Sequence, residues 1–170
     1  GLYPNSSNQI SVAYLLQGLS RAQAVIPRDA NGLPSSQGKI GLISIGMSNT
    51  TMEFSVFKTT ADADADKNPK LVIVDTAEGG KDAEKVKNAS DDYWTTWVPQ
   101  HLSAAGVSVA QVQAAWLKEA IATPSNFGGF PASTQRLQAD LEAILAILTS
   151  TFPNLQLVYV SNRTYAGYAT

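Results

Sequence analysis

Four short apolar runs stand out along the chain after Lys39, and each is bounded by turn-forming residues. Few polar residues interrupt these runs, which is typical of strands buried on both faces of a parallel sheet. The third run also suits a helix, because it contains alanine and glutamine residues. The four predicted strands are Ile40–Ile45, Leu71–Val74, Val112–Leu117 and Leu155–Val160.

Apolar residues at helical spacing lie between these runs. The clearest predicted helix covers Ser133–Thr151 and carries leucine and isoleucine residues along one side. Another covers Tyr93–Ala105, with a kink near Pro99. A third begins at the N-cap Asn49, and we expect its apolar residues to face inward. Those residues are Met52, Val56 and Phe57.

The alternation of strands and helices predicts the fold class and the domain organisation. Strands that alternate with helices form parallel sheets with right-handed crossovers. We therefore expect an α/β fold, a three-layer α/β/α domain over residues 39–170 with a parallel, flavodoxin-like sheet. Residues 1–38 are expected to form an irregular lead-in that packs on the domain, with a helix near Val12–Ala24.

Polar residues gather at the predicted carboxyl ends of the strands. Open α/β sheets bind their ligands outside these ends, so we expect the functional site at this edge. Four loops meet there: Gly46–Asn49, Asp75–Gly80, Lys118–Glu119 and Ser161–Arg163.

Composition narrows the possible function classes. A formal net charge of −2 excludes a non-specific nucleic-acid binder, and no apolar run is long enough to span a membrane. The absence of cysteine and the single histidine exclude disulfides, thiolate zinc sites and multi-histidine sites, so we expect neither a metal nor a cofactor. A charged fraction of only 15% favours an extracellular or periplasmic protein. The sequence predicts no particular oligomeric state.

The loop after the first strand carries a candidate nucleophile, Ser48. Gly46 allows a sharp turn, and a serine at the start of the next helix lies beside unpaired backbone N–H groups. A serine in this position suits nucleophilic attack, and its own N–H group can stabilise an oxyanion. The alternative interpretation is that Ser48 or Asn49 only caps the helix.

The loop after the second strand contains Glu78-Gly79-Gly80. A double glycine lets the backbone come close to a substrate, so the N–H group of Gly79 or Gly80 can donate to an oxyanion. The alternative interpretation is an ordinary turn.

Together the two loops resemble the SGNH (GDSL-like) hydrolase superfamily. Gly46-Met47-Ser48-Asn49 is similar to its first sequence block, with Met47 where an aspartate is usual, and the loop from Asp75 to Gly80 matches the second block in position. The segments 42–50 and 158–168 are similar to those of an uncharacterised bacterial branch. The resemblance implies a serine hydrolase of acyl or acetyl esters, often on carbohydrates.

Two further blocks of that superfamily differ here. Lys118 stands where the third block has an asparagine, so Lys118 would have to donate to the oxyanion. The fourth block, Asp-x-x-His, is missing, and the chain ends at Thr170 where the last helix of the fold would follow, so we expect a truncated domain. We expect His101 at the opposite edge of the sheet, which leaves no complete triad and little turnover.

Other residues have two interpretations each. Arg163 with Tyr165 suits an anion or carboxylate, or Arg163 pairs with a loop acid. The cluster of Tyr93, Trp94 and Trp97 is either core or a platform for sugar stacking. The expected substrate-binding residues are Asn49, Glu78, Arg163 and Tyr165.

Two functions therefore remain. The first is an SGNH-like serine esterase, with Ser48 as nucleophile and with Gly79, Gly80 and Lys118 around the oxyanion. The second is a non-catalytic module on the same scaffold that binds a small molecule or a carbohydrate.

Overall fold

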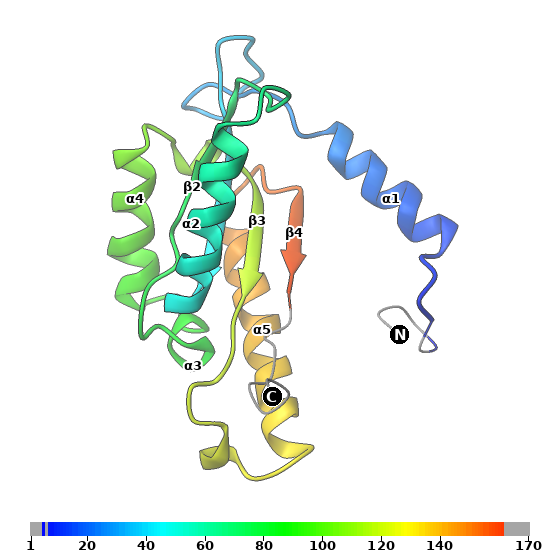
Figure 1. Cartoon of the computed structure of the whole chain (residues 1–170), viewed down its shortest axis with the longest axis vertical. Helices are drawn as coiled ribbons and strands as arrows, with labels where there is room; N and C mark the ends of the chain where they lie inside the picture. The colour runs from blue at the N-terminus through cyan, green and yellow to red at the C-terminus, as the bar shows by residue number, and fades with distance from the viewer. Residues whose placement is uncertain (1–4, 6, 162–170) are drawn as a thin grey trace.

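The computed structural model describes residues 5 and 7–161, and these form a four-stranded sheet with helices on both sides (Figure 1). All strand pairs are parallel, in the order β2-β1-β3-β4. This arrangement confirms the predicted three-layer α/β/α fold and shows that the third apolar run is a strand. The strands are β1 (Ile40–Gly46), β2 (Leu71–Val74), β3 (Val112–Lys118) and β4 (Leu157–Val160).

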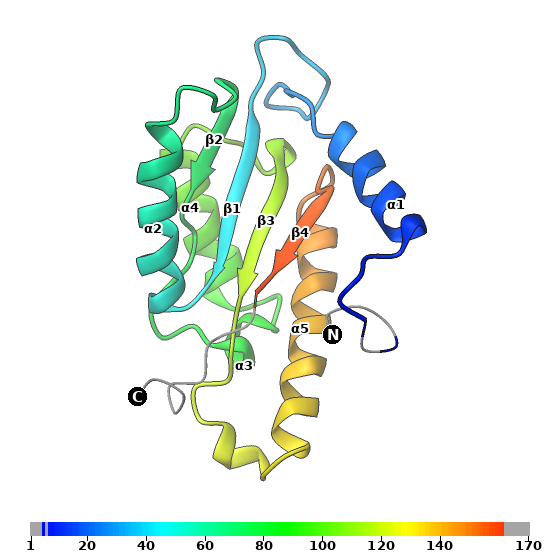
Figure 2. The same ribbon diagram turned by 45° about the vertical axis from the view of Figure 1, so that its right-hand side comes forward.

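The helices cover the two faces of the sheet unequally (Figure 2). One side, called here the α2 face, carries α2 (Ser48–Asp62). The opposite side, called the α5 face, packs against α3 (Ala83–Val86), α4 (Val98–Ala104) and α5 (Ala132–Thr151). The predicted amino-terminal helix is α1 (Val12–Gln23), which lies beside the edge strand β4. The remaining short helical turns are η2 (Tyr93–Trp97), η3 (Val109–Gln111) and η4 (Pro124–Phe127).

The hydrophobic core lies on the α5 face. Ile43 and Leu117 point from the strands onto Ile144 of α5, and all three are fully buried. Tyr93 and Trp94 belong to the same core, which confirms the core interpretation for these two residues and removes them from any sugar-binding platform.

The orientation of α2 differs from the expectation. The residues predicted to face inward are exposed: Met52, Val56 and Phe57. Thr50 and Phe54 are buried instead, because the Thr50 hydroxyl donates to the backbone oxygen of Lys118 at 2.8 Å. A polar residue therefore sets the rotation of the helix, which hydrophobic spacing alone does not reveal.

Other boundaries follow the predictions closely. The segment predicted as one kinked helix is a π-helical turn followed by α4, and Pro99 lies at the start of α4. Strand β4 begins two residues later than expected, at Leu157. Within the described part of the chain, no helix combines the length and the apolar character that a membrane crossing requires.

Candidate active site

The turn between β1 and α2 presents Ser48 at the sheet edge. Ser48 is exposed and is the first residue of a 15-residue helix, where the backbone N–H groups have no intrahelical acceptor. A Cβ atom on Gly46 would lie 2.2 Å from Thr50 Oγ1 and 2.5 Å from the backbone oxygen of Lys118. Only glycine fits there, so the close approach of the chain to β3 depends on Gly46.

The loop after β2 packs against this turn. The N–H group of Glu78 donates to the backbone oxygen of Gly46 at 2.9 Å, and the Thr51 hydroxyl donates to that of Ala77 at 3.2 Å. A Cβ atom on Gly79 would lie 3.7 Å from the Cβ of Ser48, which is ordinary contact. Ser48 and Gly79 are therefore neighbours, as the sequence predicts.

Buried hydrogen bonds join the start of this loop to β1. The Ser44 hydroxyl donates to Asp75 Oδ1 at 2.5 Å and accepts from the N–H groups of Thr76 and Ala77 at 3.0 and 3.1 Å. The Thr76 hydroxyl donates back to the Ser44 backbone oxygen. These bonds fix the start of the second loop on β1, and Ser44 and Thr76 are both fully buried.

Asn49 and Glu78 offer free acceptor atoms at this edge. Asn49 Oδ1 and Glu78 Oε2 are buried and have no hydrogen-bond partner among the described residues. Burial raises the pKa of Glu78 above its ordinary value; the nearby ammonium of Lys81 opposes this shift, and the carboxylates of Asp92 and Asp91 reinforce it. Asn49 forms no side-chain cap bond on α2, whose N-cap residue is Met47. An acceptor left unpaired in this way favours a ligand that donates hydrogen bonds.

The ammonium group of Lys118 is engaged by Glu53 of α2. Both carboxylate oxygens of Glu53 accept from Lys118 Nζ, which also lies 5.8 Å from the centroid of the Trp116 ring. The Lys118 side chain is buried in this pair, while that of Glu53 is half-exposed. Lys118 would have to leave this ion pair to donate to an oxyanion at Ser48.

His101 lies nearer to this edge than the sequence analysis expects. The His101 ring lies against Trp97, with 4.2 Å between the ring centroids, and the Trp97 indole donates to the backbone oxygen of Thr76, just after β2, at 3.1 Å. The imidazole Nδ1 lies 2.9 Å from the backbone oxygen of Trp97. No hydrogen bond among the described residues joins His101 to Ser48. The prediction that His101 lies at the opposite edge of the sheet is therefore wrong. The prediction that His101 does not pair with Ser48 agrees with the hydrogen bonds of the described residues.

Arg163 and Tyr165, and the loop from Asn162 onward, lie outside the described residues. Gly80 adopts φ +82°, as expected for a turn glycine, and a Cβ atom added to it would meet no atom within 4 Å. No group of three His, Cys, Asp or Glu side chains within residues 7–161 could hold a metal ion.

Three residues that shape this edge were not predicted from the sequence: Ser44, Thr50 and Glu53. Ser44 is the one polar residue inside an apolar strand, and a buried polar residue needs partners, so this signal was available. Thr50 and Glu53 carried no comparable signal, because their partner Lys118 is 68 and 65 residues away along the chain.

No protein-family model matches the chain, and no curated protein sequence matches it significantly. The relation to SGNH hydrolases therefore remains a hypothesis that depends on the residues themselves.

Proposed function

We propose that Ser48 is the nucleophile of an SGNH-like ester hydrolase that acts on acyl or acetyl esters of a hydroxyl-rich carrier such as a carbohydrate. The observation that carries this proposal is the contact between Ser48 and Gly79 at the amino terminus of α2. The N–H groups of these two residues supply the oxyanion donors, and the helix amino terminus favours the negative charge that develops there.

The choice of substrate follows from the free acceptors. Asn49 Oδ1 and Glu78 Oε2 are buried and unpaired among the described residues, so each side chain must rotate outward before its oxygen accepts a hydrogen bond from a hydroxyl group of the ligand. A carbohydrate offers several such hydroxyl groups close together. A purely hydrocarbon ester would leave both acceptors without partners, which costs binding free energy.

Glu78 is the proposed general base. Lys118 is not available for this role, because its Nζ donates to both carboxylate oxygens of Glu53. Glu78 precedes Gly79 in the loop, and burial raises its pKa, which makes its carboxylate a stronger base than an ordinary one.

Turnover is expected to be slow. A carboxylate is a weaker base than imidazole, and loss of the proper base costs a serine hydrolase several powers of ten in rate. We therefore expect the serine to react with strong electrophiles while simple acetyl esters are hydrolysed very slowly.

The alternative is a binding module that does no chemistry. It is favoured by one observation, that His101 Nδ1 contacts the backbone oxygen of Trp97. In that case the free acceptors bind a carbohydrate and Ser48 remains unreactive.

A fluorophosphonate probe followed by intact-mass measurement separates the two functions. We expect one adduct on the wild type and none on Ser48→Ala. Ser55→Ala is the matched control, because Ser55 is an exposed serine on the same helix whose hydroxyl donates to the Met52 backbone oxygen, and it should label as the wild type does. Glu78→Gln should slow labelling at least about tenfold. A folded wild type that takes up no probe would overturn the nucleophile role of Ser48.

A further inference from the structure

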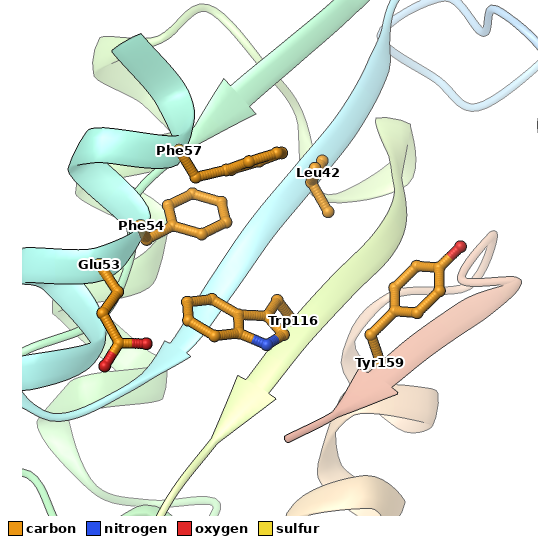
Figure 3. Close-up of a pocket in the computed structure, with 6 residues that line it drawn as sticks. All are labelled: Leu42, Glu53, Phe54, Phe57, Trp116 and Tyr159. Carbon is orange, nitrogen blue, oxygen red and sulfur yellow. The ribbon is translucent and has the colours of Figure 1, made fainter. Parts of the chain in front are cut away.

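The α2 face carries a broad apolar trough between α2 and α1. In Figure 2 the strands β1, β3 and β4 lie uncovered between these two helices. A cavity of about 420 Å³ occupies the α2 side of this trough (Figure 3). It is lined by Leu42, Glu53, Phe54, Phe57, Trp116 and Tyr159.

The trough continues across β4 to α1. Tyr159 lines both the first cavity and a second one, which lies between β4 and the side of α1 that carries Tyr14 and Leu15. The apolar cavity beside α2 therefore adjoins, at Tyr159, a second cavity whose lining mixes apolar residues with Gln17, Arg21 and Gln156. Phe57 is 46% exposed and Tyr159 is 58% exposed, so the chain itself leaves about half of each side chain in contact with water.

Helix α1 has a second apolar side, which does not line the cavity between α1 and β4. Val12 and Leu16 lie one turn apart, do not line this cavity, and are 71% and 60% exposed. All residues of α1 are exposed, and a helix of 12 residues has little stability without packing. The same chain thus presents an unpacked apolar helix and an apolar sheet face that lacks a helix.

We propose that the trough is filled by α1 of a second copy of this chain, in a reciprocal two-fold dimer. Four large apolar side chains are available to this interface: Phe57 and Tyr159 at the trough, 46% and 58% exposed, and Val12 and Leu16 on α1, 71% and 60% exposed. A reciprocal dimer buries each of these sets twice, and the removal of apolar surface from water is the main favourable contribution to association.

The chain's own α1 is held elsewhere. Gln113 of β3 bonds both backbone groups of Ile26 at 3.0 and 2.8 Å, so the chain is fixed just after α1 ends. Arg21 in the last turn of α1 donates to Gln156 at 3.3 Å, beside β4. These contacts keep α1 at the sheet edge, so a second copy must supply the helix that lies over the sheet.

Charge does not oppose this pairing. Arg21 is the single charged residue of α1, and Glu53, the charged residue that lines the cavity beside α2, is paired with Lys118. The whole chain has a net charge of only −2, so two copies repel each other weakly. The proposal does not depend on the function proposed for Ser48.

Disulfide trapping tests the proposal directly, because the sequence contains no cysteine. A Leu16→Cys protein is mixed with a tagged Phe57→Cys protein and oxidised gently, so any bond between the two positions must join different copies. We expect covalent heterodimers on non-reducing gels. The matched control pairs Phe57→Cys with Phe130→Cys, since Phe130 is 87% exposed in the loop before α5 and collides with other molecules at least as easily. This pair should give no heterodimer above background.

Two further measurements keep the proposal falsifiable. By sedimentation velocity, Tyr159→Glu should weaken self-association at least about tenfold, whereas Phe130→Glu should leave it unchanged. A wild type that stays monomeric at high micromolar concentration overturns the proposal. So does a Leu16→Cys/Phe57→Cys double variant that oxidises within one chain, because the chain's own α1 would then fill the trough.

Discussion

The two faces of the sheet are built differently. On the α5 face, Ile43 and Leu117 are fully buried under Ile144 and Leu148 of α5. On the α2 face, Leu42 and Trp116 line an open cavity, and α2 leaves Phe57 largely exposed. The α5 face therefore supplies most of the folding stability, because stability follows the apolar area removed from water.

On the α2 face, the position of α2 is instead fixed by polar contacts at the start of this helix. Thr50 and Thr51, in the first turn of α2, bind the backbone oxygens of Lys118 and Ala77. These bonds tie the start of the helix to the ends of β3 and β2, which is where Ser48 lies. The site is therefore positioned by hydrogen bonds at the start of α2 and not by packing along this helix.

The largest expected effect contrasts one apolar residue from each face. Ile144→Ala removes a fully buried side chain and should lower the free energy of unfolding by about 2–5 kcal/mol. Phe57→Ala removes a side chain that is almost half exposed and should cost less than about 1 kcal/mol at concentrations where the chain is monomeric. Urea unfolding of both variants measures the difference. Equal losses at low protein concentration would mean that the α2 face is as well packed as the α5 face.

The same contrast explains how much of the fold the sequence could predict. Helix α5 was readable because its apolar residues repeat with the helical period, and the four strands because each is a nearly uninterrupted apolar run. The rotation of α2 was not readable, because a threonine that binds Lys118 takes the inward position while Phe57 stays outside.

The candidate site was predictable only in part. Gly46, Ser48 and Gly79 are local signals at strand ends, and the fold brings them together. The partner of Lys118 was not predictable, because Glu53 is 65 residues away and only the finished sheet brings the two together. The position of His101 was not predictable either, because it depends on Trp97, whose ring lies against the imidazole and whose indole donates to the backbone oxygen of Thr76 after β2.

An ion network on the α5 side gives an intermediate effect. Glu84 of α3 accepts from Arg136 at 2.5 and 3.0 Å and from Lys87 at 2.9 Å, and the guanidinium of Arg136 is the main reason that its pKa falls from 4.5 to about 2. A carboxyl group with a depressed pKa in the folded state stabilises the protein above the unfolded pKa, and this stabilisation is lost as the pH falls through the folded pKa. Glu84→Gln should therefore cost about 1–3 kcal/mol at pH 7, with the gap to wild type closing between about pH 4.5 and pH 2.

Urea unfolding over a series of pH values measures this gap. Glu142→Gln is the control, because Glu142 is exposed on α5 and accepts only from Gln138, so its gap should be small at every pH. Burial, and after it the neighbouring Glu84, raises the pKa of Asp140, which accepts from Lys87. Glu84→Gln removes the repulsion between these two carboxylates, so the expected loss of stability lies toward the lower end of the range. A gap that stays constant down to pH 2 would contradict the assigned role of Glu84.

The ion pair on the α2 side gives the smallest expected effect. Lys118→Met keeps a long apolar side chain beside Trp116 and removes only the ammonium group, whose partner Glu53 is half-exposed. Exposed and half-exposed pairs contribute about 0–1 kcal/mol, so urea unfolding should barely change. Fluorophosphonate labelling of Ser48 should change less than about twofold, because the ammonium is bound by Glu53 and not by the oxyanion. Glu53→Gln serves as the matched variant that frees the ammonium instead of removing it. If Lys118→Met slows labelling at least about tenfold at unchanged stability, the ammonium leaves Glu53 during the reaction, and Lys118 is the third oxyanion donor that the sequence first indicated.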